Sequence, residues 1–214
     1  MADMNVVSGT VGRPPSLADG DRKALILQAA ETVFAGFGYG DATMEEVARA
    51  CGMAKKTVYK YFPDKASLFG ALLESHDIAV IDSGPQSAGD QAEARLVRLI
   101  EDVARHILSP RQITLTRLVI AESIKYPELA QRFYRDCVEK TMSHVSWALV
   151  DNPSLRLPPG TDSRVFADML ISTVLGSIHL RALMLNPTQD ALEEELEARI
   201  PLVAELIKRS FAVP

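Results

Sequence analysis

Apolar residues recur at three- and four-residue steps along the chain from residue 21 to residue 211. This spacing is typical of amphipathic helices, and it never gives way to the two-residue alternation of a half-buried strand. The pattern therefore predicts an all-α fold of about nine helices. The expected helices are one at 21–38, two short ones within 43–62, and one each at 64–82, 90–108, 111–125, 127–150, 163–185 and 189–211.

Residues 43–65 have the sequence form of a helix-turn-helix. Thr43 and Glu46 stand at the spacing of a capping box, in which each side chain bonds the other residue's backbone N–H. Gly52 follows the first short helix and suits a positive φ at a helix end. In the second short helix only Val58 is placed to face inward. Most of that helix is therefore predicted to be available to a partner.

The outward positions of this second helix carry cations, hydroxyls and phenols. Lysines supply affinity for phosphates, and hydroxyl groups can contact base edges or backbone oxygens. Residues 51–65 hold four lysines and one aspartate, a local charge of +3, whereas the whole chain has a net charge of −5. The contrast predicts a local DNA-binding surface on an otherwise acidic protein.

Turn residues and caps divide the chain into three parts. Residues 1–20 are expected to form a flexible arm, which is either a disordered leader or a segment that lays Arg13 into a DNA minor groove. Residues 21–66 form the predicted helix-turn-helix DNA-binding domain. Residues 67–214 form a larger helical domain, which is interrupted near its start by the glycine- and serine-rich break at 83–89.

The helix expected after the basic stretch begins with an unusual charge. Asp64 is placed as its N-cap, and Lys65 follows in the first turn, where a cation is unfavourable for the helix dipole. Because helix N-termini also bind phosphates, Lys65 is expected to meet the DNA backbone there. A simply solvated lysine is the alternative.

Other classes of function are disfavoured. The sequence has no nucleophile elbow, glycine-rich phosphate loop or histidine pair at metal spacing, so neither an enzyme nor a cofactor or metal site is expected. The two cysteines lie far apart and the first twenty residues lack a secretory signal, which together favour a reduced, cytoplasmic protein. The most apolar stretch, 165–185, is interrupted by Asp168, His179 and Arg181, so no membrane span is expected.

A longer pattern of spaced residues surrounds the helix-turn-helix. It consists of residues 25–30, Phe34, Gly38, Tyr39, residues 43–48, Gly52, residues 56–62, Lys65, Leu68 and Phe69. This pattern resembles the DNA-binding domain of the TetR/AcrR family of transcriptional regulators. A second segment, residues 117–122 with 126–129, Phe133 and Tyr134, is similar to the AefR-like branch of that family.

The resemblance implies that the first three helices bind a double-stranded DNA operator. One departure is Ala54, which stands where the family often has serine or threonine. An alanine N-cap forgoes about 1 kcal/mol of capping, and it removes one possible phosphate contact. By the family's pattern, the DNA contacts fall on Thr43, Lys55, Lys56, Thr57, Tyr59, Lys60, Tyr61 and Lys65.

The resemblance also implies that the remaining helices bind an unidentified small-molecule effector. The expected function is a repressor that releases a palindromic operator when a small, largely apolar molecule binds this C-terminal domain. A transcriptional activator or a small-molecule sensor on the same fold is the alternative. The candidate ligand-binding residues are Leu99, Val103, His106, Val119, Glu122, Tyr134, Met142 and Val145, each of which could instead be an ordinary core or rim residue.

The last two helices are the candidates for a homodimer interface. Gly176 and Ser177 lie in the middle of the first of them and would let a partner helix approach closely, as in a four-helix bundle. Close contact within one subunit is the alternative for Gly176. The expected interface residues are Gly176, Ser177, Leu180, Leu196 and Val203.

Overall fold

The computed structural model describes residues 18–75, 92–152, 155, 157 and 159–211, and all regular structure among them is helical. The π-helical segment η2 continues α7 into α8 without a break, so the described residues form nine helical rods, as predicted. The helices are α1 (Asp19–Asp41), α2 (Met44–Ala50), α3 (Lys55–Tyr61), α4 (Lys65–Glu74), α5 (Ala92–Ile107), α6 (Pro110–Glu122), α7 (Pro127–Phe133), η2 (Tyr134–Glu139), α8 (Lys140–Val150), α9 (Ser163–Leu185) and α10 (Gln189–Phe211).

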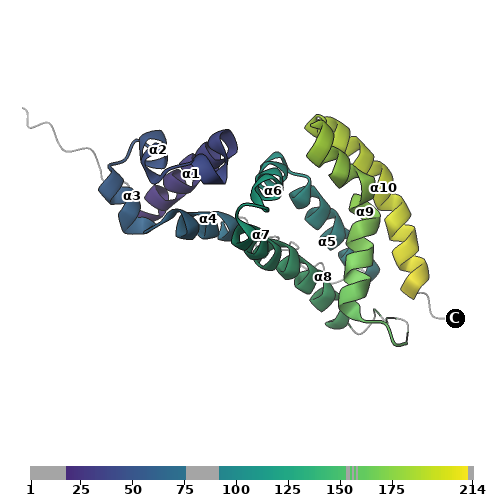
Figure 1. Cartoon of the computed structure of the whole chain (residues 1–214). Coiled ribbons are helices and arrows are strands. Elements are labelled where there is room, and N and C mark those ends of the chain that lie inside the picture. The colour runs from purple at the N-terminus through teal and green to yellow at the C-terminus, as the bar shows by residue number, and fades with distance from the viewer. Residues whose placement is uncertain (1–17, 76–91, 153–154, 156, 158, 212–214) are drawn as a thin grey trace, which may run out of the picture.

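Three sequence expectations fall wholly or partly outside the described residues. They are the arm at 1–20 beyond its last three residues, the break at 83–89, and the ends that face this break in the helices expected at 64–82 and 90–108. Within the described residues, α1 to α4 gather at one end of the molecule and α5 to α10 form the larger part (Figure 1).

Local capping explains where the short helices begin and end. Thr43 accepts a hydrogen bond from the backbone N–H of Glu46, whose carboxylate accepts one from the Thr43 N–H, so the predicted capping box is present. Asp64 caps α4 as expected, with Ser67 as its reciprocal partner. One expectation was wrong: α1 begins at Asp19, after Ala18 and without a side-chain cap, rather than at Asp21.

The helices α1 to α4 share a core with α6 and α7. Leu115, Val119, Leu129 and Phe133 belong to the same buried cluster as the small DNA-binding helices. Tyr39 marks the junction, because its ring packs edge-on against Phe69 of α4 and against Tyr126, which lies between α6 and α7. Because of these contacts, a movement of α6 or α7 would displace side chains that pack against the first four helices.

A second core lies among α5, α8, α9 and α10. The inner face of α9, which includes Ala167, Ile171, Val174 and Ile178, is buried in it. By length and composition alone α9 could cross a membrane, with a mean hydropathy of 1.3, but a core helix of a soluble protein passes the same test. Its contacts with four neighbouring helices, α5, α6, α8 and α10, favour the role of a core helix.

Two arginines tie α6 to helices on either side of it. Arg111 forms an ion pair with Glu31 of α1, with Nε 2.5 Å from Oε2. Arg117 donates from Nε to the carbonyl of Leu183 at 2.8 Å and from Nη1 to Asn186 Oδ1 at 3.2 Å. Asn186 has a positive φ of 49° and ends α9. Helix α6 therefore connects the first helix to the carboxyl end of α9.

Candidate DNA-binding surface and ligand cavity

Helix α3 buries one side chain, Val58, and exposes most of the others. Its amino end follows a tight turn in which Gly52 has a φ of 68°, as the sequence predicted. Lys55, Lys56 and Lys60 are exposed, whereas Thr57 is partly buried. The helix therefore presents a basic outer surface supported by a single buried anchor.

Neighbouring groups hold several of these side chains in place. Lys55 forms an ion pair with Glu45 of α2, and this contact raises the pKa of Lys55 and lowers that of Glu45. The ammonium of Lys55 also lies 5.6 Å from the centre of the Tyr59 ring. Such contacts between charge and ring orient the lysine while leaving it exposed.

The far end of α3 is tied to the start of α1. The hydroxyl of Tyr61 donates to Asp19 Oδ1 at 2.6 Å, and this bond lowers the pKa of Asp19. The ammonium of Lys60 lies 5.6 Å from the centre of the Tyr61 ring. Sequence reasoning did not find Asp19, because its partner is more than forty residues away.

Lys65 is placed differently from the expectation. Its ammonium donates to the carbonyls of Tyr39, Gly40 and Ala42, the last two at 2.8 and 3.0 Å. An ammonium has three donors, so these bonds use all of them. Lys65 thus ties the start of α4 to the end of α1, and the expected contact with a DNA phosphate does not fit this arrangement.

A cavity of about 280 Å³ lies within the larger part, between α5, α6, α7 to α8, and α9. The volume is just below the range of about 300–1,000 Å³ that is usual for small-molecule sites. Its walls mix apolar side chains such as Phe133, Ile171 and Leu175 with polar ones. Two of its lining residues, Gln112 and His179, each have a buried polar atom, Oε1 and Nε2 respectively, without a hydrogen-bond partner among the described residues. The cavity therefore has the mixed lining of a ligand site.

Of the eight expected ligand-binding residues, His106 and Met142 line this cavity. Leu99, Val103 and Val145 are instead buried in the core of the larger part, and Val119 in the core shared with the DNA-binding helices. Helical periodicity does not distinguish a residue that lines a cavity from one that packs against another helix. This is why these four expectations do not fit the cavity.

The other two expected ligand residues point elsewhere. Tyr134 is the first residue of η2 and is 58% exposed, and it is not among the lining residues of the cavity. Helix α1 is bent at Gly38, which has a non-helical φ of 78°. Glu122 ends α6 beside this bend, where its Oε1 accepts a weak hydrogen bond of 3.5 Å from the N–H of Gly40. A side chain at Gly38 would come within 2.6 Å of the same oxygen. Glu122 is therefore a contact between α6 and the DNA-binding helices.

The outer faces of α9 and α10 are apolar and exposed. These helices pack side by side at one edge of the molecule (Figure 1). Between its large side chains α9 exposes small ones, including Thr173, Gly176 and Ser177. Clusters of exposed apolar residues mark interaction sites. The large exposed residues here are Val165, Met169, Leu180, Met184 and Leu185 on α9 and Leu202 and Leu206 on α10.

Two of the expected dimer residues lie inside the subunit. Leu196 and Val203 are 0% and 3% exposed and belong to the core, so they face away from any partner. The prediction took its α10 interface residues from the buried side of the helix, because both sides carry leucines at helical spacing. Leu202 and Leu206 occupy the exposed side instead.

Gly176 bends α9 and contacts its own subunit. Its φ of 36° and ψ of −125° are non-helical and unfavourable for a residue with a side chain. Arg199 of α10 donates from Nη1 to the carbonyl of Val174 at 3.3 Å and from Nη2 to the hydroxyl of Ser177 at 3.0 Å. The alternative of close contact within one subunit therefore describes Gly176.

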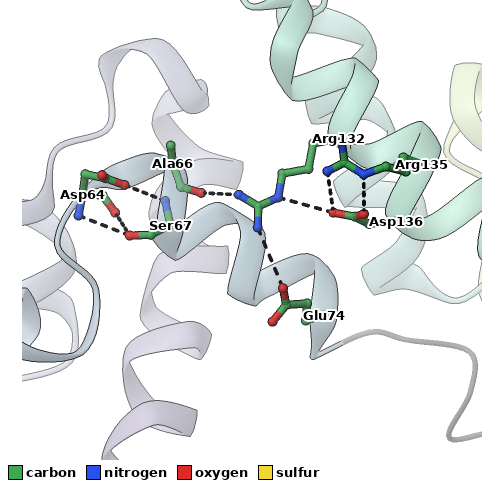
Figure 2. A network of polar contacts seen from close by, with 7 residues as sticks. All are labelled: Asp64, Ala66, Ser67, Glu74, Arg132, Arg135 and Asp136. Carbon is green, nitrogen blue, oxygen red and sulfur yellow. Dashed lines mark hydrogen bonds and ion pairs between the residues drawn. The ribbon is translucent and has the colours of Figure 1, made fainter.

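Arg132 of α7 joins the cavity wall to α4 (Figure 2). Its Nη1 donates to the carbonyl of Ala66 at 3.2 Å, and its Nη2 lies 3.8 Å from Glu74. On the other side, its Nε donates to Asp136 Oδ2 at 3.4 Å, and Asp136 is a lining residue of the cavity. A hydrogen bond from Arg135 keeps the pKa of Asp136 below its usual value. The network thus links the cavity to the DNA-binding helices through one side chain.

A basic helix-turn-helix joined to a helical body with a cavity and an apolar outer face defines a DNA-binding regulator. Two family models match this chain: bacterial regulatory proteins of the tetR family over residues 26–72, and the AefR-like transcriptional repressor C-terminal domain over residues 94–201. The chain therefore belongs to the tetR family of bacterial transcriptional regulators and has an AefR-like C-terminal domain. The expectations of an all-α fold and of this family are confirmed.

Individual proteins agree with this assignment. An HTH-type transcriptional regulator of Mycobacterium bovis is 34% identical over 110 residues, which cover 49% of this chain and 57% of the relative. The match thus spans little more than half of the relative's length. A TetR-family regulator from Mesorhizobium loti has the same fold, with a TM-score of 0.70, 24% identity, and coverage of 89% of this chain and 98% of its own.

A further solved structure contains a ligand. The regulator FadR of Bacillus subtilis, solved in complex with stearoyl-CoA, has a TM-score of 0.65 and 21% identity. The comparison covers 86% of this chain and 96% of FadR. At this identity the likeness shows a common fold.

Proposed function

We propose that this protein is a dimeric transcriptional repressor that releases a palindromic DNA operator when a small, largely apolar molecule binds its C-terminal domain. The observation that carries the proposal is α3, which exposes three lysines around one buried anchor, Val58. A helix that served only to stabilise the fold would bury more of its surface. The proposed DNA contacts are Thr43, Lys55, Lys56, Thr57, Tyr59, Lys60 and Tyr61.

A dimer supplies the second half of the DNA site. One short helix reads too few base pairs for specificity, whereas two copies related by a two-fold axis read half-sites about 34–36 Å apart or a multiple of this distance. The exposed apolar faces of α9 and α10 support a four-helix interface between two copies. In this proposal Leu180, Leu202 and Leu206 contact the partner.

Ligand response requires that the cavity and the DNA-binding helices influence each other. The segment from α7 to η2 supports such coupling, because it contributes Phe133 and Asp136 to the cavity and Arg132 to the contact with α4. A ligand that binds one position of this segment more tightly than another would shift the position of α4. The stearoyl-CoA bound by FadR supports the idea that this fold can house an effector.

An activator or a sensor on the same fold remains the second candidate. Both would use the same cavity and the same dimer. Neither function needs enzymatic activity, a cofactor or attachment to a membrane. We propose a cytoplasmic location, since the operator of a bacterial regulator lies in that compartment.

DNA binding is tested by removing the cations of α3. The variant Lys55→Ala/Lys56→Ala/Lys60→Ala is expected to lose binding to the DNA upstream of its own gene, measured by fluorescence anisotropy against salt concentration. The slope of log K on log salt should fall by about one for each lysine that contacts a phosphate. The matched control Lys140→Ala/Arg164→Ala/Lys208→Ala removes the same charge from the larger part and should bind normally. Equal binding by both variants would contradict the proposal.

The dimer is tested by sedimentation at micromolar concentration. Leu180→Glu and Leu202→Glu place charges on the proposed interface and should each give a monomer. Ile124→Glu is the control, because Ile124 is 96% exposed but lies beyond the end of α6. A native protein that sediments as a monomer, or variants that stay dimeric, would exclude the proposed interface.

A further inference from the structure

The walls of the cavity present hydrogen-bond acceptors. Thr116 donates its hydroxyl proton to the carbonyl of Gln112 at 2.8 Å, and Thr141 donates to that of Cys137 at 2.7 Å. Each hydroxyl has a single proton, so both threonines keep only lone pairs for a ligand. Asp136 and Asp168 add carboxylates to the same walls.

Gln112 is the most specific of these groups. This residue lines the cavity and is 6% exposed, and its buried Oε1 has no hydrogen-bond partner among the described residues. A buried acceptor without a partner is unfavourable, and a ligand that donates a proton to it removes that cost. The side chain therefore favours a ligand with a hydroxyl or N–H group at this point.

The two histidines, His106 and His179, are the basic side chains among the described lining residues of the cavity. None of the fifteen described residues that line the cavity is lysine or arginine. His179 is one of these residues, and its burial lowers its pKa, which favours the neutral imidazole at pH 7. A carboxylate or phosphate in this cavity would lose its hydration beside Asp168 and Asp136, and the arginines nearest to Asp136, Arg132 and Arg135, already bind that carboxylate.

We propose that the cavity binds a compact, largely apolar molecule that carries a hydroxyl or N–H donor and has no negative charge. The volume of about 280 Å³ limits the ligand to roughly the size of two fused aromatic rings with short substituents. This inference rests on the proposed function, since it names the class of effector that the regulator would detect.

The test compares four probes of one shape: naphthalene, naphthol, its methyl ether and naphthoate. Binding to the DNA-free full-length protein is measured by isothermal titration calorimetry at neutral pH. Naphthol should bind about tenfold more tightly than its methyl ether, which keeps the oxygen but lacks the donor. Naphthoate should bind more weakly than naphthalene.

A pair of variants assigns the preference to Gln112. Gln112→Met keeps the length of the side chain without the acceptor, and it should remove the preference for naphthol over the ether. Gln131→Met makes the same change at an exposed position of α7 and should leave the preference intact. Circular dichroism confirms that both variants fold.

The outcomes separate this inference from the proposed function. Tighter binding of naphthoate, equal binding of naphthol and its ether, or no binding of any probe at millimolar concentration would overturn the ligand class, while DNA binding through α3 could still hold. Selective binding of naphthol supports the ligand class. Its effect on DNA affinity is then measured separately and tests the regulatory proposal.

Discussion

The guanidinium of Arg132 lies where the side chain of residue 70 would be. A Cβ at Gly70 would lie 1.8 Å from Arg132 Nη2, well inside van der Waals contact. Gly70 is in the middle of α4, and Arg132 belongs to α7. The absence of a side chain at position 70 therefore lets the arginine reach the carbonyl of Ala66 across the junction between the two parts of the molecule.

This relationship predicts that Gly70→Ala destabilises the native protein but stabilises a protein that lacks Arg132. In an ordinary helix, alanine is more stable than glycine by about 0.8–1 kcal/mol. Here it would displace the guanidinium, and we expect the free energy of unfolding to fall by roughly 1–2 kcal/mol. In an Arg132→Ala background the space is empty, so the same substitution should stabilise the protein.

Urea unfolding of the four proteins in this double-mutant cycle gives the coupling energy directly. Equal effects of Gly70→Ala in both backgrounds would show that the two residues do not interact.

Substitution of Lys65 should lower the stability of the fold and leave the DNA contacts unchanged. Lys65→Met removes the three hydrogen bonds to the end of α1, and we expect unfolding to become easier by roughly 2 kcal/mol. Lys56→Met is the matched control, because it removes an exposed lysine and should cost less than about 0.5 kcal/mol.

The salt dependence of DNA binding separates the two roles. Lys56→Met should lower the slope of log K on log salt by about one, whereas Lys65→Met should not change it. A lowered slope for Lys65→Met would restore the phosphate contact expected from the sequence.

The weak start of α3 can be strengthened. Ala54 precedes the helix without a side-chain cap, and Ala54→Ser should add about 1 kcal/mol of stability. For a chain of this size the melting temperature should rise by roughly 2–4 °C, measured by calorimetry. Ala50→Ser serves as the control, since an exposed serine at the end of α2 caps no N-terminus. Equal shifts for both variants would indicate that capping is not the cause.

Features set by neighbours in the sequence were the ones that could be predicted. The capping box of Thr43 and Glu46, the N-cap at Asp64 and the positive φ of Gly52 each depend on residues a few positions apart. Helical periodicity and caps also gave nine helices, since every one of them except α3 has a buried stripe. The π-helical segment was missed, because no local residue pattern marks it.

Features set by distant residues could not be predicted. Lys65 finds its acceptors at the end of another helix, and its role could not be read from its place in a first turn. Both sides of α10 carry leucines, so the sequence did not distinguish buried Leu196 from exposed Leu202. The cavity draws its lining from several helices, and of the residues expected there only His106 and Met142 line it.

Burial of His179 predicts a pH dependence of stability. Burial lowers the pKa of this histidine in the folded protein below its ordinary value of 6.5. As the pH falls below 6.5, the unfolded chain binds a proton at this position before the folded protein does. The stability that the neutral residue contributes is therefore present above pH 6.5 and is lost as the pH falls toward the lowered pKa.

In His179→Gln, the decrease in the free energy of unfolding between about pH 6.5 and pH 5 should accordingly be smaller, since glutamine does not titrate. The free energy of unfolding is measured in urea at a series of pH values. The nearby carboxylate of Asp136 does not interfere, because its pKa is lowered from 3.8 and lies below this range. His144→Gln, outside the cavity, is the control. If His179→Gln keeps the full pH dependence of the native protein, burial of the neutral imidazole does not contribute to it.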